Sequence, residues 1–207
     1  MNYLRIDKED VCNGEGLRVV LWLSGCSHKC KGCQNPQTWD ANSGISFDES
    51  AKEELFRELD KDYISGITLT GGDPLFESNL DGVLDLVTEV NKRYNTAQNI
   101  IRNQDKNNNI LNENANEFRL SFPHKSIWLY SGYTWEQLFE DDDFDIQGGI
   151  CENQIRRAIV LSCDVFVDGQ YIDSQRDITL PYRGSTNQQI IDTQQSIQKG
   201  KIILWQT

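Results

Sequence analysis

"GCSHKCKGCQNPQTW" (residues 25–39) holds three cysteines in the spacing Cys-x3-Cys-x2-Cys: Cys26, Cys30 and Cys33. The stretch follows the apolar run LRVVLWLSG (17–25), whose β-branched and aromatic residues are typical of a buried strand. We therefore expect the cysteines at the C-terminal end of a strand, where α/β folds place their ligands. That position favours a functional site.

Three thiols this close together could serve a disulfide, a zinc ion or an iron–sulfur cluster. The chain has six cysteines, and a disulfide framework is disfavoured in the reducing cytoplasm. A zinc site would use Cys26, His28, Cys30 and Cys33, but structural zinc sites usually join two separated pairs of ligands. A [4Fe-4S] cluster takes thiolates at its corners, and three cysteines on one loop leave one iron without a protein ligand. The spacing favours the cluster, with zinc as the alternative.

The acidic composition argues against two classes of partner. The 20 Lys and Arg residues against 32 Asp and Glu residues give a net charge of −12, which opposes nucleic acids and anionic membranes alike. No apolar run approaches the roughly 20 residues that span a bilayer, and the N-terminal MNYLRIDKED has no apolar signal region. We expect a soluble, cytoplasmic protein with no nucleic-acid and no membrane partner.

The order of apolar segments predicts an α/β fold. Strand-like runs lie at 17–25, 66–72, 126–132, 158–169 and 201–205. Apolar residues at helical spacing lie at 48–61, 79–94 and 134–140. This alternation predicts parallel strands joined by crossover helices. With 38% apolar residues in 207 positions, the chain is expected to form a single domain, 1–207.

One segment interrupts the alternation. Residues 95–117 contain nine Asn and two Gln, a composition that cannot build a packed face. We expect an Asn-rich surface insertion at about 95–125. The acidic run EDDDFD (140–145) is expected to be a solvated loop.

Two motifs, which follow each other along the chain, resemble those of the radical S-adenosylmethionine (SAM) enzymes. The first is the cysteine triplet after the first convincing strand, and the second is GGDP (71–74) after the next strand, similar to Gly-Gly-Glu-Pro in many members. More closely, the chain resembles the activating proteins of anaerobic ribonucleotide reductase, the smallest branch of the glycyl-radical-enzyme activases. The stretches that carry this resemblance are NGEGLR (13–18), SGCSHKCKGCQNPQTW (24–39), LTGGDPL (69–75), IWLYSGYTWEQL (127–138), DVFVDGQY (164–171) and RGSTNQQIID (183–192).

The resemblance implies a fold, two cofactors and a reaction. The fold would be an incomplete (β/α) barrel of the radical SAM type, with about five or six mostly parallel strands. A [4Fe-4S] cluster on Cys26, Cys30 and Cys33 would bind SAM at its fourth iron and cleave it reductively to methionine and a 5′-deoxyadenosyl radical. The implied partners are the glycyl radical domain of the reductase large subunit and an electron donor such as a flavodoxin.

The resemblance also implies a set of cofactor-binding residues: Gly32, Cys33, Gln34, Gly71, Gly72, Asp73, Ser131 and Arg183. Gly71 and Gly72 would bring a strand end close to the ligand, and Asp73 would accept from the SAM ammonium group, with a plain turn as the alternative. The guanidinium of Arg183 could grip a carboxylate of SAM or of the partner's C-terminus, with a surface arginine as the alternative.

Gly32 stands where many radical SAM enzymes carry an aromatic residue that packs on adenine. The reductase activases resemble this chain in having glycine there, so adenine must stack elsewhere.

Other cysteine and histidine residues fit the site less well. Cys12, Cys151 and Cys163 lack partners at ligand spacing. His28 fits a loop filler or a hydrogen-bond donor to the cluster better than a ligand.

Three classes of function follow. The first is a radical SAM activase that places a glycyl radical on a large reductase. The second is another radical SAM enzyme that acts on a small molecule, and the third is a zinc-binding adaptor without catalytic activity. The short chain favours the first class, because a barrel without extensions leaves its active site open to a loop of another protein.

Overall fold

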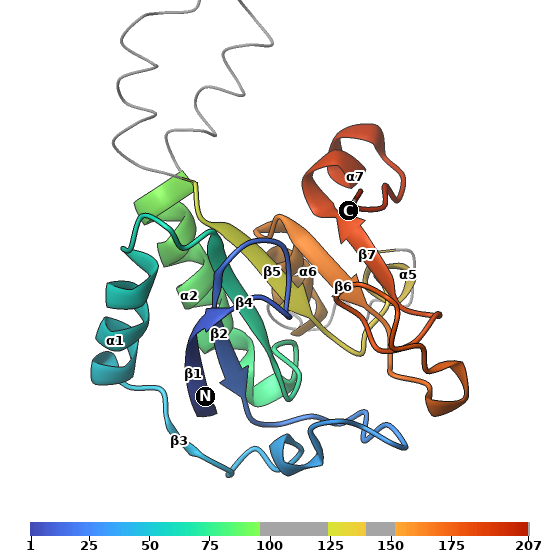
Figure 1. Ribbon diagram of the computed structural model, residues 1–207, viewed down its shortest axis with the longest axis horizontal. Helices are drawn as coiled ribbons and strands as arrows, with labels where there is room; N and C mark the ends of the chain where they lie inside the picture. Colours follow the sequence, from blue (N-terminus) through green and yellow to red (C-terminus); the bar gives the residue numbers. More distant parts are fainter. Residues whose placement is uncertain (96–123, 140–151, 207) are drawn as a thin grey trace, which may run out of the picture.

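The computed structural model describes residues 1–95, 124–139 and 152–206 and contains one seven-stranded sheet (Figure 1). Its strands, in spatial order, are β3 (Ile45–Ser46), β1 (Asn2–Asp10), β2 (Arg18–Leu23), β4 (Gly66–Gly71), β5 (Ser126–Tyr130), β6 (Val165–Asp168) and β7 (Gln189–Asp192). The four central strands, β2, β4, β5 and β6, are parallel, whereas the outer strands are antiparallel to their neighbours. The sheet is open, with β3 and β7 at its two edges.

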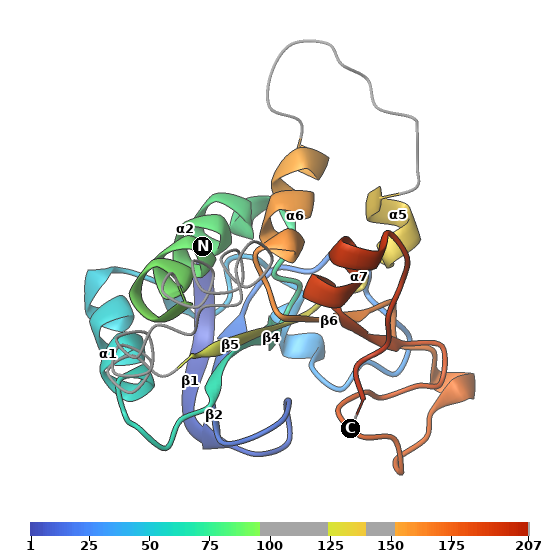
Figure 2. The same ribbon diagram turned by 90° about the horizontal axis from the view of Figure 1, so that it is seen from above.

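Helices cover one face of the sheet, and all but the last of them lie between parallel strands in the sequence. They are α1 (Glu49–Leu59), α2 (Leu80–Val90), α5 (Trp135–Phe139), α6 (Glu152–Leu161) and α7 (Thr193–Lys199). Figure 2 shows α2 and α6 above the strands and α1 beside them at the left. The start of α1 is fixed by Asp48, whose side chain accepts a hydrogen bond from Ala51 N at 3.0 Å, and α7 begins in the same way at Asp192.

The side-chain alternation of β5 separates two apolar clusters. Ile127 and Leu129 join the main core between the sheet and the helices. Trp128 points to the other face, where it packs with Val165 and Val167 of the neighbouring strand. This follows from the two-residue period of a strand. Strands β5 and β6 are thus covered on both faces. β2 is likewise buried along its whole length.

A buried arginine joins the N-terminal ends of three parallel strands. The guanidinium of Arg18 donates to Thr68 Oγ1 at 2.8 Å, to Ile67 O at 2.6 Å and to Ser126 O at 2.7 Å. Burial lowers the pKa of Arg18 to about 10, so the group still carries its charge at neutral pH. The opposite, C-terminal ends of these strands remain free to form loops.

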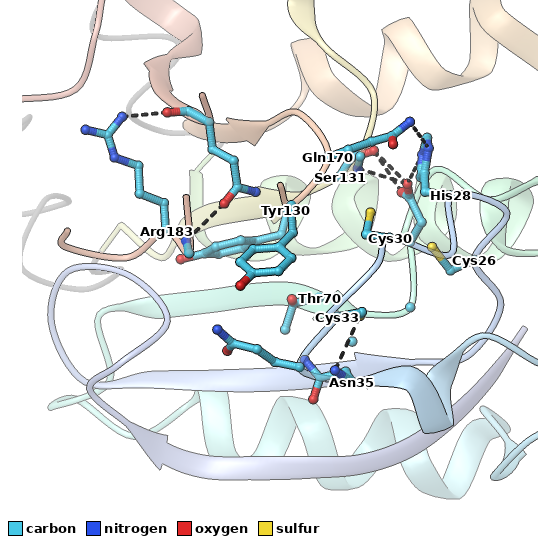
Figure 3. Close-up of a pocket in the computed structure, with 18 of the residues that line it drawn as sticks. Cys26, His28, Cys30, Cys33, Asn35, Thr70, Tyr130, Ser131, Gln170 and Arg183 are labelled. Atoms are coloured by element: carbon cyan, nitrogen blue, oxygen red, sulfur yellow. Dashed lines mark hydrogen bonds and ion pairs between the residues drawn. The ribbon is translucent and has the colours of Figure 1, made fainter. Parts of the chain in front are cut away.

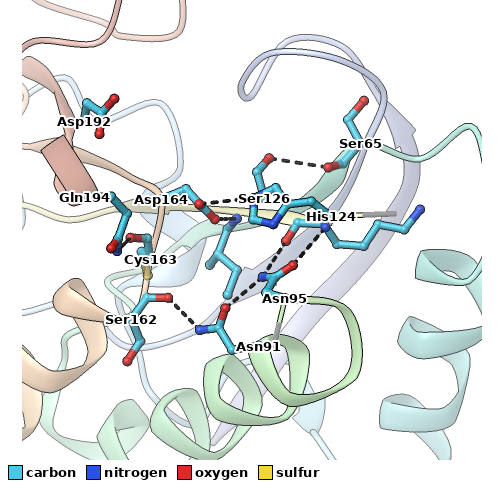
Figure 4. A network of polar contacts seen from close by, with 12 residues as sticks. Ser65, Asn91, Asn95, His124, Ser126, Ser162, Cys163, Asp164, Asp192 and Gln194 are labelled. Carbon is cyan, nitrogen blue, oxygen red and sulfur yellow. Dashed lines mark hydrogen bonds and ion pairs between the residues drawn. The ribbon is translucent and has the colours of Figure 1, made fainter. Parts of the chain in front are cut away.

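Asn95 and Lys125, at the two ends of the Asn-rich insertion, are hydrogen-bonded to each other (Figure 4). Asn95 Nδ2 donates to Lys125 O at 3.1 Å, and Lys125 N donates to Asn95 Oδ1 at 3.1 Å. Asn91 extends the network by donating to Ser162 O at 2.7 Å. The insertion at 96–123 and the acidic run at 140–145 themselves lie outside the described residues.

The sequence predicted the α/β class and most of the central elements. The strands expected at 17–25, 66–72 and 126–132 are confirmed as β2, β4 and β5, and helices begin within the ranges expected for α1, α2 and α5. The sheet has seven strands rather than five or six. Among the described helices none is long and apolar enough to cross a membrane.

Two expected strands were wrong. The first half of the strand predicted at 158–169 belongs to α6, because Arg156, Ile159 and Val160 are buried at helical spacing, and only Val165–Asp168 is strand. The strand predicted at 201–205 is reduced to a single bridge between Leu204 and Ile191. The sequence analysis also missed β1, β3, β7 and α7.

Candidate functional site

A cavity of about 480 Å³ opens at the C-terminal ends of the four parallel strands (Figure 3). The loops after β2, β4, β5 and β6 all contribute to its lining, although they are far apart in the sequence. Crevices at this end of a parallel sheet are the usual ligand sites of α/β folds. Nine of the predicted site residues line it: Cys26, Cys30, Cys33, Gln34, Gly71, Gly72, Asp73, Ser131 and Arg183.

The cysteine loop is folded back on itself so that all three thiols face this cavity. The base of the loop is closed by two backbone bonds, from Gly25 N to Thr38 O at 2.7 Å and from Cys26 N to Trp39 O at 3.1 Å. Cys33 N donates to Cys30 O at 3.1 Å, which gives the tight bend that the short spacing requires. One loop therefore presents three ligands to one space.

Gly32 makes this bend possible but does not line the cavity. Its φ is +76°, a left-handed conformation that glycine adopts without strain. A Cβ at this position would also lie 2.7 Å from Asp173 Oδ1. The absence of an aromatic side chain before Cys33 thus has a local steric reason.

Burial raises the pKa of the Cys26 and Cys30 thiols above the ordinary value. The nearby Asp73 carboxylate adds to the shift at both thiols. Without a positive partner these sulfurs remain protonated, whereas iron would stabilise them as thiolates and release their protons. Binding of a cluster here would therefore be coupled to the loss of these protons.

His28 does not share a coordination centre with the cysteines. Its Nε2 lies 2.9 Å from Asp73 Oδ2, and its Nδ1 lies 3.1 Å from Gln170 Nε2. Both ring nitrogens thus face other side chains. In the part of the chain that the structure describes, no three His, Cys, Asp or Glu side chains converge on a point that could hold a single metal ion. With both ring nitrogens directed at other side chains, His28 is not placed as a fourth ligand beside the three thiols.

The Gly-Gly-Asp loop after β4 lies directly against the cysteine loop. Gly72 N donates to Leu23 O at 2.8 Å, and Asp73 N donates to Gly25 O at 2.7 Å. A Cβ at Gly71 would lie 2.8 Å from Leu23 N, and one at Gly72 would collide with Gly25 O. Only glycine allows the two loops to approach this closely.

The Asp73 carboxylate is buried and accepts several hydrogen bonds from the protein. It receives Ser131 Oγ at 2.8 Å, Leu75 N at 2.8 Å and Gly132 N at 3.1 Å. Ser131 is directed at Asp73 in turn. These two predicted site residues are brought together, and their shared contacts organise the loops around the cavity.

Arg183 and Gln34 both line the cavity, Arg183 from the segment before β7 and Gln34 from the cysteine loop. Arg183 Nη1 donates to Gln188 O at 2.5 Å, while its Nε is buried without a hydrogen-bond partner among the described residues. Gln34 is exposed, and its Nε2 lies 3.6 Å from where a Cβ of Gly184 would be. Both side chains have donors available for a ligand.

Sequence reasoning missed several residues of the cavity. Tyr130 is the last residue of β5 and lines the cavity. Its hydroxyl is buried and has no hydrogen-bond partner among the described residues. Gln170 and Tyr171, from the loop after β6, also line it. All three follow or end a parallel strand, which is the signal that could have found them. Cys12 lines the cavity as well, whereas Cys163 is buried in the core.

Comparisons with known proteins identify the family. Residues 12–117 and 103–191 match the family model described as a 4Fe-4S single cluster domain. Over 190 residues the chain is 32% identical to the anaerobic ribonucleoside-triphosphate reductase-activating protein of Haemophilus influenzae, covering 91% of this chain and 96% of that protein. This chain belongs to that family of activating proteins. The phage T4 activating protein is 35% identical over 92% of this chain, and that of Escherichia coli K12 is 30% identical over 91%.

Family membership confirms the resemblance noted in the sequence. The chain is an activating enzyme of this family and carries the family's iron–sulfur cluster domain. The matches cover 93% of the T4 activating protein and 96% of the E. coli one, so the similarity extends across nearly the whole of each relative.

Proposed function

We propose that this chain is a radical SAM activase that places a glycyl radical on an anaerobic ribonucleotide reductase. The observation that carries the proposal is the meeting of the cysteine loop and the Gly-Gly-Asp loop in one cavity at the C-terminal ends of the parallel strands. In the same proposal, the open sheet is the incomplete (β/α) barrel of the radical SAM type, and the chain acts as a single domain in the cytoplasm.

Cys26, Cys30 and Cys33 would hold a [4Fe-4S] cluster whose fourth iron has no protein ligand. When bound, the cluster supplies one electron to the sulfonium of SAM, whose C5′–S bond breaks to give methionine and a 5′-deoxyadenosyl radical. The protein's task is to bind and orient the reactants and to exclude water. The cavity walls from four loops serve that task.

The remaining predicted residues would bind SAM around the cluster. The backbone at Gly71 and Gly72 can approach a ligand closely, because neither residue has a side chain. Arg183 Nε, buried and free of a protein hydrogen bond among the described residues, suits a carboxylate. Asp73 would act mainly by holding the surrounding loops, since its oxygens already accept protein donors. Gln34 would offer backbone groups to the nucleotide, whereas Gly32, which lies outside the cavity lining, would contribute the bend before Cys33.

The substrate would be a glycine of the reductase large subunit, delivered as a loop into the open side of the cavity. Transfer of one hydrogen atom from the glycine Cα to the 5′-deoxyadenosyl radical would give 5′-deoxyadenosine and a glycyl radical that the flanking amide and carbonyl groups would stabilise. Glycine also has no side chain to obstruct the approach. The electron would come from a small donor such as a flavodoxin.

Electron paramagnetic resonance tests the activase function. Reduced protein, SAM and the cognate reductase are mixed without oxygen, and we expect a doublet from a single α-hydrogen, absent when the reductase glycine is changed to alanine. Cleavage of SAM with no radical on the reductase would instead support a radical SAM enzyme for a small molecule. Protein that binds zinc and no iron would support the adaptor.

Iron content tests the cluster ligands separately. Replacing Cys26, Cys30 or Cys33 with Ala is expected to remove most of the iron and all SAM cleavage. Cys12→Ala is the matched control, because this thiol lines the same cavity from another loop. Cys151→Ala and Cys163→Ala are also expected to keep the iron. Iron loss in any of these three variants equal to that in Cys30→Ala would show that the ligand set is wrong.

A further inference from the structure

His28 lies in the cysteine loop, but its ring turns away from the thiols toward the other loops of the cavity (Figure 3). Its side chain is only 10% exposed. Nδ1 lies 3.1 Å from Gln170 Nε2, and Nε2 lies 2.9 Å from Asp73 Oδ2. The ring also packs edge-on against Tyr133, with 4.8 Å between ring centroids. A buried imidazole with a partner on each nitrogen is not a simple loop filler.

The contact with the Gln170 amide nitrogen, which can only donate, favours one tautomer of the ring. The amide of Gln170 donates to Nδ1, so Nδ1 offers its lone pair and the ring proton sits on Nε2, facing Asp73. The Nε2–H bond does not point straight at the carboxylate, since Nε2 has no well-aligned hydrogen bond. The two groups are close enough that a small rotation of the ring would align them.

Asp73 connects this contact to the rest of the cavity. The same carboxylate accepts from Ser131 Oγ and from Gly132 N, both in the loop after β5. Gly132 leaves space for the imidazole, because a Cβ there would collide with the His28 ring. One continuous set of polar contacts thus joins the loops after β2, β4, β5 and β6, and His28 adds a side chain of the cysteine loop to the backbone bond from Asp73 N to Gly25 O.

We propose that His28 is a positioning residue that fixes the cysteine loop relative to the loops that receive SAM. The inference rests on the proposed function, since it assigns His28 a role beside the proposed cluster and SAM. The three thiols can hold iron without His28, because none of their ligand positions uses it. The orientation of the free iron toward SAM, however, depends on how the cysteine loop sits against Asp73. Groups that orient metal ligands in this way typically change affinity or activity 10- to 100-fold when removed.

Four variants separate this role from others. His28→Ala removes both ring contacts. His28→Gln can place an amide N–H at the Nε2 position and keep the donor to Asp73, whereas His28→Asn reaches only the Nδ1 position near Gln170. Lys31→Ala is the matched control, because Lys31 is an exposed residue of the same loop. Each variant is reconstituted with iron and sulfide without oxygen, and the reductase is left out.

Two quantities are measured on each protein. The first is the iron content per chain, and the second is the electron paramagnetic resonance spectrum of the reduced cluster during a titration with SAM. We expect all four variants to keep at least about four-fifths of the wild-type iron. His28→Ala and His28→Asn should broaden the cluster signal and require at least about tenfold more SAM for the SAM-induced spectral change. His28→Gln should recover most of the affinity, and Lys31→Ala should match wild type.

Three results would overturn the inference. Iron loss in His28→Ala as severe as in Cys30→Ala would show that His28 holds the cluster itself. A SAM titration of His28→Ala identical to that of Lys31→Ala would show that the ring has no positioning role. Equal defects in His28→Gln and His28→Asn would show that the contact to Asp73 is not what matters. Because no reductase is present, these results do not depend on whether a glycyl radical forms.

Discussion

Asp73 shows how much of the cavity depends on one buried carboxylate. Its two oxygens receive donors from Ser131, Gly132 and Leu75 and lie beside His28. A carboxylate accepts at every lone pair, whereas an amide offers one accepting oxygen and an NH2 group. The charge of Asp73 therefore matters less than its capacity to accept hydrogen bonds on both sides.

The first prediction concerns the iron-free protein. Asp73→Asn places an NH2 group against at least one N–H donor, and we expect it to lower the free energy of unfolding by about 2 kcal/mol. Urea unfolding followed by circular dichroism measures the change. Glu53→Gln, an exposed amide substitution on α1, should change stability by less than about 0.5 kcal/mol. Equal stability of the two variants would contradict the role given to Asp73.

A second prediction concerns the dependence of stability on pH. Complete burial raises the pKa of the Cys163 thiol well above its ordinary value. The folded protein therefore binds this proton more tightly than the unfolded chain does, and the stabilisation is present below the unfolded-state pKa of about 8.5 and is lost as the pH rises above it.

Cys163→Ala removes this contribution. In urea unfolding of iron-free protein from about pH 7 to about pH 10, wild type should lose stability more steeply than the variant, by up to about 1.4 kcal/mol per pH unit. The other thiols and the tyrosines titrate in both proteins, so their contributions cancel in the difference. Parallel curves for the two proteins would show that Cys163 does not remain a buried thiol.

At the scale of elements, the insertion can be separated from the fold. Asn95 and Lys125 exchange two hydrogen bonds, so the two ends of the insertion are held side by side by residues outside it. The third prediction is that residues 97–123 can be replaced by a Gly/Ser linker of about six residues without loss of structure. A shorter connection between the same ends should leave stability unchanged or raise it by up to about 1 kcal/mol.

Thermal unfolding and iron content of the shortened chain measure the outcome. Asn95→Ala in the full-length chain is the companion variant, because it leaves the Lys125 carbonyl buried without this donor and should cost about 1–3 kcal/mol. If the shortened chain fails to fold while Asn95→Ala is as stable as wild type, the fold depends on the insertion and not on the paired ends.

Elements with a strong local pattern could be predicted from the sequence, and edge elements could not. Strands β2, β4 and β5 are buried on both faces and are therefore continuous apolar runs. β1 is half exposed, and its sequence NYLRIDKED mixes charged and apolar residues. The AIVL segment of α6 has high β propensity, but tertiary packing of α6 against α2 decides its conformation.

The residues of the site also divide into those that a local sequence pattern marks and those that it does not. The spacing of Cys26, Cys30 and Cys33 identifies them as a unit, since ligands on one loop are visible in one stretch of sequence. Tyr130 and Gln170 reach the cavity only because parallel strands end together, and no local pattern marks them. The partners of His28 lie 45 and 142 positions away, so its role could not be read from its neighbours.

At the scale of the whole molecule, the proposed cluster would stabilise the fold. The cysteine loop is hydrogen-bonded to the loop after β4 and faces the loops after β5 and β6 across the cavity. A cluster bound to the cysteine loop would therefore restrain the loops at the carboxyl ends of all the parallel strands. Any ligand that binds only the folded state raises stability by mass action. The proposed cluster should therefore couple loop order to global stability.

The fourth prediction compares iron-loaded with iron-free protein. Loading should raise the free energy of unfolding by at least about 2 kcal/mol, or the midpoint of thermal unfolding by roughly 5 °C for a chain of this size. Anaerobic calorimetry provides the measurement. Cys30→Ala carried through the same reconstitution should show no increase. Equal midpoints for loaded and iron-free wild type would mean that the cluster binds without ordering the loops.

The paired ends at Asn95 and Lys125 also offer a point for attaching the enzyme to other materials. They precede β5, whereas the cavity lies beyond its other end, and a five-residue strand separates the two by about 16 Å. An affinity handle, a fluorophore or an electrode tether placed between these ends would leave the mouth of the cavity facing away from the support. Immobilised protein could then receive electrons and reductase from solution without redesign of the catalytic face.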